Sequence, residues 1–79
     1  MTPIYITSSN IDCAAHDGEQ LYIRFKNGKV YCYDRVSYSV FDAMVKSESP
    51  GKFFSSFVRP KYGYMEMDFD PFRMESVAA

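Results

Sequence analysis

The chain has 79 residues and a formal net charge of −1, which indicates a single small domain. A domain of this length buries only about 60% of its unfolded surface, and the aromatic side chains (seven Tyr and seven Phe) compensate by burying a large area each. No apolar run approaches the roughly 20 residues of a membrane-spanning helix, and residues 1–20 lack the features of a signal peptide. We therefore expect a cytoplasmic protein without membrane contact.

The charges are divided unevenly along the chain. Residues 1–23 carry three acids and no base, residues 24–62 carry eight bases and three acids, and residues 63–79 carry four acids and one base. A basic middle between acidic ends is compatible with binding of a polyanion, and equally with ordinary solubility and internal ion pairing.

The first strand is predicted at residues 11–16. Residues 4–6 form a shorter apolar piece that would either pair as a sheet edge or stay unpaired. Within 11–16, Ile11, Cys13 and Ala15 alternate with Asp12, Ala14 and His16. His16 stands at the strand end beside a turn, which favours a surface position over a catalytic one.

Residues 20–34 contain the clearest pattern, two alternating runs that flank Asn27-Gly28, a strong hairpin signal. A two-residue turn there pairs Phe25 with Val30. One face of the hairpin is then apolar, with Leu21, Ile23, Phe25, Val30 and Cys32. The other face is aromatic and cationic, with Tyr22, Arg24, Lys26, Lys29, Tyr31 and Tyr33. Together with the first strand, this predicts an antiparallel meander whose central strand is residues 20–26.

Two short helices are predicted next. Apolar residues recur at helical spacing from Val36 to Val45, with Ser37 at the N-cap, and Pro50 suits the start of a second helix that Pro60 ends. The phenylalanines of the second helix indicate core rather than a cofactor site. We predict that five side chains are buried together: Phe25, Val30, Phe41, Phe54 and Phe57.

Residues 62–70 alternate again and predict a last strand whose acids, Glu66, Asp68 and Asp70, point outward. Residues 71–77 would add one helical turn. The predicted fold class is α+β: a small antiparallel β-meander of three strands, with a fourth from the C-terminal segment, packed with two short helices.

No motif of catalysis or metal binding is present. Cys13 and Cys32 fall on strands that flank the central one, about 9–10 Å apart, so we expect free, buried thiols in a reducing compartment. The chain has a single His, no metal-ligand spacing, no glycine-rich phosphate loop and no nucleophile elbow. We expect no enzyme activity, no catalytic residue, no metal and no cofactor.

An ordered series of motifs resembles the KTSC domain, a short family named for its place at the C-terminus of some lysyl-tRNA synthetases and also found as free-standing bacterial and phage proteins. The motifs are Ser8-Ser9-Asn10-Ile11, Leu21-x-Ile23-x-Phe25-x-x-Gly28-x-x-Tyr31-x-Tyr33-x-x-Val36, Val40-Phe41, Ser49-x-Gly51-x-x-Phe54, Val58 and Lys61-Tyr62. The resemblance covers residues 8–62 of a single domain and implies no established activity, although the synthetase context suggests RNA binding. Ser37 departs from the Pro that is common there, and the acidic extension 63–79 lies outside the pattern.

Two hypotheses of function follow, and a homodimer is compatible with either. In the first, the chain is a binding module for RNA or single-stranded nucleic acid, unless a helix or the last strand covers the tyrosines. Its site residues would be Tyr22, Arg24, Lys26, Lys29, Tyr31 and Tyr33, with Arg35, Arg59 and Lys61 on phosphates. In the second, it is a phage-encoded protein that inhibits a host complex, such as a CRISPR–Cas effector, by placing Glu66, Asp68 and Asp70 in a basic groove.

Overall fold

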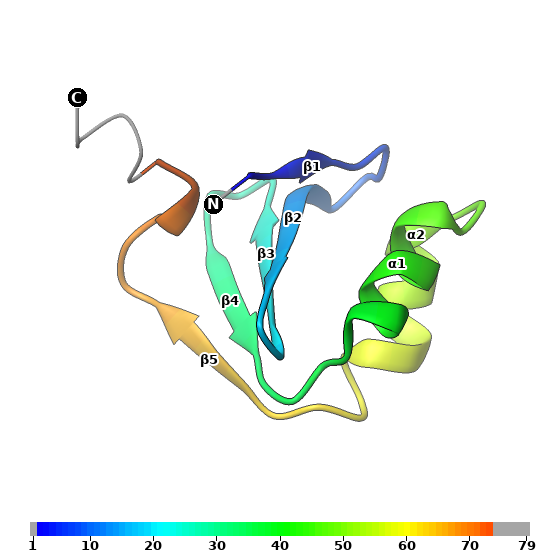
Figure 1. Cartoon of the computed structure of the whole chain (residues 1–79). Coiled ribbons are helices and arrows are strands. Elements are labelled where there is room, and N and C mark those ends of the chain that lie inside the picture. The colour runs from blue at the N-terminus through cyan, green and yellow to red at the C-terminus, as the bar shows by residue number, and fades with distance from the viewer. Residues whose placement is uncertain (1, 74–79) are drawn as a thin grey trace.

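The computed structural model describes residues 2–73, which form a five-stranded antiparallel sheet with helices against one face (Figure 1). The strands follow one another in chain order: β1 (Ile4–Tyr5), β2 (Ile11–Asp17), β3 (Gln20–Phe25), β4 (Val30–Tyr33) and β5 (Tyr64–Met67). The predicted α+β class and meander are confirmed. The strand count was too low, because the short apolar piece near the N-terminus pairs as β1.

The helices lie between β4 and β5 in the chain. They are α1 (Tyr38–Lys46) and α2 (Pro50–Phe53), which continues directly into a π-helical turn, η1 (Phe54–Val58). Ser37 is the N-cap of α1 as predicted, but its side chain makes no capping hydrogen bond. Pro50 starts α2, where its missing N–H costs no helical hydrogen bond.

The β3–β4 hairpin has a three-residue loop, residues 26–28, instead of the predicted two-residue turn. The Phe25 backbone N–H donates to the carbonyl of Lys29 (2.8 Å), and the N–H of Gly28 donates to the carbonyl of Phe25 (2.9 Å). Gly28 has a φ of 92°, a left-handed conformation that suits the last residue of such a loop.

The longer loop shifts the strand register by one residue, so that Leu21 pairs with Tyr33 and Ile23 with Tyr31. A shift of one residue moves every β4 side chain to the opposite face of the sheet. The predicted aromatic–cationic face is therefore wrong. Tyr31 and Tyr33 lie on the face that the helices cover, whereas Tyr22 shares the opposite face with its partner Cys32.

A bulge in β2 corrects the predicted alternation of the first strand. Ile11 pairs with Phe25, but Cys13 pairs with Arg24, so Asp12 is an extra residue between the two pairs. Ile11 and Ala14 consequently pack under the helices, while Cys13 and Ala15 face the other way.

The main core fills the space between the sheet and the helices. Its buried residues are Ile6, Ile11, Ala14, Leu21, Ile23, Tyr33, Val36, Phe41, Met44, Phe54 and Val58. Three of the five predicted core residues are not among them: Phe25 is only partly buried against this core, Phe57 is 60% exposed, and Val30 is buried on the other face. His16 is half-buried rather than a surface residue, with Nε2 2.6 Å from the carbonyl oxygen of Val36 and its ring stacked on Phe41.

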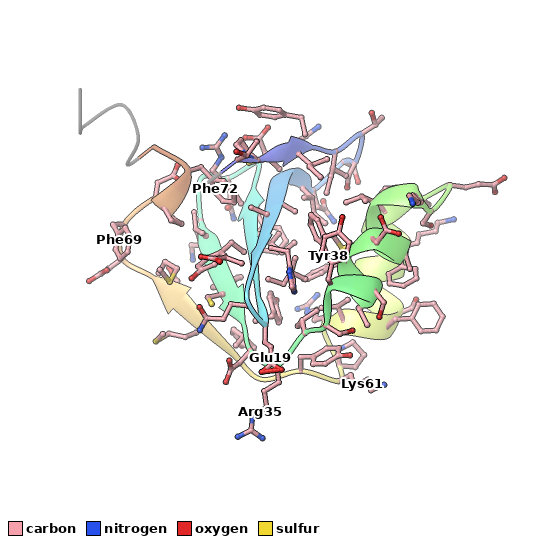
Figure 2. All side chains as sticks on the ribbon, in the orientation of Figure 1. Glu19, Arg35, Tyr38, Lys61, Phe69 and Phe72 are labelled. Carbon is pink, nitrogen blue, oxygen red and sulfur yellow. The ribbon has the colours of Figure 1, made fainter. Side chains whose placement is uncertain are left out.

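A smaller cluster covers the opposite face, where Phe72 packs with Cys13, Ala15 and Val30. Phe72 belongs to a 3₁₀ turn, η2 (Pro71–Arg73), which starts the predicted helical turn; residues 74–77 of that prediction lie outside the described residues. Figure 2 shows Phe72 beside the sheet on the side away from the helices. Cys13 and Cys32 are free and buried as predicted, and burial raises the pKa of both thiols.

Candidate functional site

A pocket of about 220 Å³ lies between the sheet and the helices. Three parts of the chain line it: the helix-facing side of the sheet, the α2–η1 helical segment, and two adjacent loops. The lining residues are Asn10, Ile11, Phe25, Asn27, Lys29, Tyr31, Tyr33, Gly51, Phe54, Ser55, Arg59 and Tyr64. Two of them are cationic and none is acidic.

Five aromatic rings line the pocket, and each one neighbours the next in a closed cycle. In order they are Phe25, Tyr31, Tyr64, Tyr33 and Phe54, with ring centroids 5.5, 5.4, 5.4 and 5.3 Å apart and 5.8 Å between Phe54 and Phe25. Tyr64 is 62% exposed and Tyr31 is half-buried, whereas Tyr33 is only 2% exposed. Tyr31 and Tyr64 therefore offer accessible rings, and Tyr33 is mainly a core residue.

The π-helical turn places Arg59 at the pocket, because the Arg59 backbone N–H donates to the carbonyl of Phe54 five residues earlier (2.9 Å). Burial raises the pKa of Tyr33 to about 12, and the nearby charge of Arg59 opposes that rise. Within residues 2–73, neither Arg59 nor Lys29 forms a salt bridge. The pocket consequently combines aromatic rings with two positive side chains, of which Lys29 also borders a second hollow that Glu66, Asp68 and Asp70 line.

The two loops are held together at the other end of the pocket. The Lys26 backbone N–H donates to the carbonyl of Asn10 (2.8 Å), and Asn27 Oδ1 accepts a hydrogen bond from the Lys29 backbone N–H (2.9 Å). Gly51 lets α2 approach the first of these loops, since a Cβ at this position would lie 2.7 Å from Ser8 Oγ. The Asn side chains thus add polar groups beside Lys29.

Four of the nine predicted nucleic-acid-binding residues line the pocket: Lys29, Tyr31, Tyr33 and Arg59. The other five are Tyr22, Arg24, Lys26, Arg35 and Lys61, and the structure does not bring them together. Arg35 points away from the sheet at the bottom of the view in Figure 2, and Lys61 lies below the helices, its Nζ 5.8 Å from the centroid of the Tyr62 ring.

Arg24 is occupied by internal contacts on the opposite face of the sheet. Its Nη2 lies 2.8 Å from Asp12 Oδ2, its Nη1 lies 2.8 Å from Asp70 Oδ2, and its guanidinium carbon Cζ is 5.5 Å from the centroid of the Phe72 ring. The hydrogen bond to Asp70 is the main cause of a raised pKa for Arg24. Arg24 fastens the C-terminal segment to the sheet and is not available to a phosphate.

The same contact corrects the prediction for the acidic residues. Glu66 and Asp68 are exposed as expected, but Asp70 is partly buried against Arg24, and its other carboxylate oxygen accepts a hydrogen bond from the Phe72 backbone N–H (2.9 Å). Among the described residues, no group of three or more His, Cys, Asp and Glu side chains could hold a metal ion. No helix in residues 2–73 is long and apolar enough to cross a membrane.

Sequence reasoning missed several lining residues, above all Tyr64, Phe25 and Phe54, because the predicted register put the tyrosines on the other face. One signal was available: Gly directly after Asn also fits a three-residue loop that ends in a left-handed residue. No pattern in the sequence predicts the π-helical turn that orients Arg59.

The KTSC domain model matches residues 7–62, most of the chain. The chain belongs to the KTSC domain family. A protein of Tsukamurella paurometabola is similar at 39% identity over 59 residues, which cover 72% of this chain and 88% of that protein. The crystal structure of a KTSC domain protein from Yersinia pestis has the same fold, with a TM-score of 0.76 at 23% identity, covering 84% of this chain and 96% of that one. In this KTSC chain, Tyr64 lies beyond the matched residues and still completes the pocket.

Proposed function

We propose that the chain is a non-enzymatic module that binds single-stranded nucleic acid at the aromatic–cationic pocket. RNA is the first candidate ligand. The observation that carries the proposal is the convergence of five aromatic rings with Lys29 and Arg59 on one pocket without a carboxylate. Proteins hold single strands by stacking bases on aromatic side chains while cations contact the phosphates. Tyr31 and Tyr64 would supply the stacking.

The charge of the pocket favours a nucleotide over a quaternary ammonium group, which is another ligand that aromatic rings bind. Aromatic cages also bind quaternary ammonium groups through cation–π attraction. Two positive side chains and no acidic one would repel such a cation. A planar, anionic ligand satisfies both the rings and the charges, and a nucleotide has both properties.

Binding of single-stranded RNA can be tested by fluorescence anisotropy with a labelled, mixed-sequence oligonucleotide at low salt. We expect the logarithm of the affinity to fall linearly with the logarithm of salt concentration, and the slope to decrease by about one for Lys29→Gln or Arg59→Gln. Tyr31→Ala should weaken binding by about 1–3 kcal/mol and leave the slope unchanged.

The matched control is Arg35→Gln, because Arg35 is also an exposed arginine but does not line the pocket. It should change the slope less than Arg59→Gln. Circular dichroism would verify that each variant is folded. A folded protein that fails to bind at tens of micromolar would reject the proposal.

A second candidate function, protein binding, has support from β5. This strand is a sheet edge, its Met65 is 64% exposed, and the neighbouring Phe69 is 50% exposed and protrudes on the far side of β5 in Figure 2. An exposed edge strand can pair with a strand of another chain. Glu66 and Asp68 would then suit a basic partner, such as the nucleic-acid groove of a host complex; Asp70 is engaged by Arg24.

A further inference from the structure

The two cations of the pocket stand at opposite ends of a row of tyrosines. Lys29 directly precedes β4, and residues two apart on a strand share a face, so Lys29, Tyr31 and Tyr33 form one row. At about 3.3 Å per residue, Lys29 and Tyr33 lie roughly 13 Å apart along it. Arg59 lines the pocket from the far end, because the segment that follows it runs to Gly63, whose carbonyl accepts from the Asp34 backbone N–H, and to Tyr64, which pairs with Tyr33.

The accessible rings lie between these charges. Tyr31 is the middle residue of the row, and its ring meets that of Tyr64 at 5.4 Å and 64°. Asn10 and Asn27 line the pocket beside Lys29, and Ser55 lines it from the helix segment that also carries Arg59. A ligand that fills the pocket would therefore meet a cation, then rings, then a second cation.

The size of the pocket limits this ligand. A volume of about 220 Å³ lies below the roughly 300–1,000 Å³ of sites for drug-sized molecules. Such a space suits one nucleotide rather than two stacked ones. A nucleotide within a strand carries a phosphate on each side of its sugar, and each phosphate needs a partner when water is displaced.

We infer that the pocket recognises one nucleotide of a strand by both of its phosphates, one at Lys29 and the other at Arg59, with the base against Tyr31 and Tyr64. This inference rests on the proposed function and specifies its ligand as a nucleoside 3′,5′-bisphosphate unit. A nucleoside monophosphate leaves one of the two cations without a partner.

Titration calorimetry with the full chain tests the inference. The probes are adenosine 3′,5′-bisphosphate, the 3′- and 5′-monophosphates, adenosine and inorganic pyrophosphate. We expect the bisphosphate to bind about tenfold or more tightly than either monophosphate, because a hydrogen bond to a charged group typically contributes that factor. Adenosine and pyrophosphate should each bind more weakly than the bisphosphate, since one lacks the charges and the other lacks the base.

Two variants test which of the two cations contacts which phosphate. Lys29→Gln should abolish the preference for the bisphosphate over one of the monophosphates, and Arg59→Gln should abolish the preference over the other. Lys26→Gln is the matched control, because Lys26 is an exposed lysine in the loop that precedes Lys29 and does not line the pocket. It should retain the full preference.

The outcomes separate this inference from the proposed function. Equal affinity for the bisphosphate and for the tighter-binding monophosphate would overturn the inference. So would a result in which Lys29→Gln and Arg59→Gln both abolish the preference over the same monophosphate. Pyrophosphate binding as tight as bisphosphate binding would also overturn it. If single-stranded RNA still binds in parallel anisotropy measurements, only the two-phosphate inference fails. If neither RNA nor the bisphosphate binds, the proposed function fails with it.

Discussion

Arg24 and Arg59 carry the same charge in different surroundings. Arg24 is 18% exposed and held by two carboxylates, whereas Arg59 is exposed and has no salt bridge within residues 2–73. The partners of Arg24 come from β2 and from the C-terminal segment, so its role is to connect them. Only Arg59 is placed to meet a ligand.

This difference predicts opposite effects of two substitutions. Arg24→Ala should lower the free energy of unfolding by about 1–3 kcal/mol, because it leaves Asp12 and Asp70 without their cation, and it should not change the salt dependence of RNA binding. Arg59→Gln should change the salt dependence and leave stability nearly unaltered. Urea titration and anisotropy measure the two effects, and a flattened salt slope in Arg24→Ala would contradict this assignment.

Phe41 and Phe57 provide a second matched pair, since one is buried in the main core and the other is 60% exposed. Phe41→Ala should cost roughly 3–5 kcal/mol of stability by deleting a large core ring. Phe57→Ala should cost under about 1 kcal/mol. Equal losses of unfolding free energy in the two variants, measured by urea titration, would contradict the difference in burial between Phe41 and Phe57.

The buried phenol of Tyr33 should make the fold less stable at alkaline pH. Its pKa is raised from 10.0 to about 12 in the fold, mainly by burial, so the unfolded chain loses this proton first and stability declines as pH rises from about 10 toward 12. The shift corresponds to at most roughly 2–3 kcal/mol. Tyr33→Phe should show a shallower decline in the free energy of urea unfolding between these pH values, and an equally steep decline in this variant would contradict the prediction.

At the scale of elements, the hairpin loop decides where the tyrosines lie. Residues 26–28 end with Gly28 in the left-handed region, which sets the register of β4 and turns Tyr31 and Tyr33 toward the helices. The π-helical turn acts similarly on the other wall, where its longer hydrogen-bond span brings Arg59 to the pocket. Two local departures from regular geometry thus create the site.

Gly28→Ala isolates the effect of the loop conformation. Neither Gly28 nor Gly63 has an atom within 4 Å of a new Cβ, but only Gly28 has a positive φ. Gly28→Ala should cost about 1–2 kcal/mol from backbone strain, while Gly63→Ala should be close to neutral. Thermal or urea unfolding of the two variants gives the comparison, and equal stabilities would mean that the loop relaxes without strain.

At the scale of the whole molecule, the described part of the acidic C-terminal extension, residues 63–73, is part of the fold. Residues beyond 62 lie outside the family match, yet β5 pairs with β4, Tyr64 lines the pocket and Asp70 holds Arg24. Glu66 and Asp68, which are exposed, do not line the aromatic pocket, but they line a neighbouring hollow together with its cation Lys29.

The double variant Glu66→Gln, Asp68→Asn distinguishes the two candidate functions. If the chain binds nucleic acid, removing two negative charges should raise its affinity for RNA two- to threefold at low salt and less at high salt, since screening weakens surface charges. If the acids bind a basic partner, the same variant should lose that partner. Anisotropy with RNA gives the first result, and reduced affinity there would contradict the electrostatic reasoning.

The sequence by itself determined the order of the elements from β2 to β5, the N-cap at Ser37, the helix start at Pro50, and the separation of Cys13 from Cys32. These features follow from alternation, capping residues and strand spacing, which are local. Tertiary structure alone decided the register of β4, the bulge at Asp12, the partners of Arg24 and the position of Arg59. A shift of one residue exchanges the faces of a strand, and packing and turn geometry choose between the two alternatives, because the alternating pattern is the same in both.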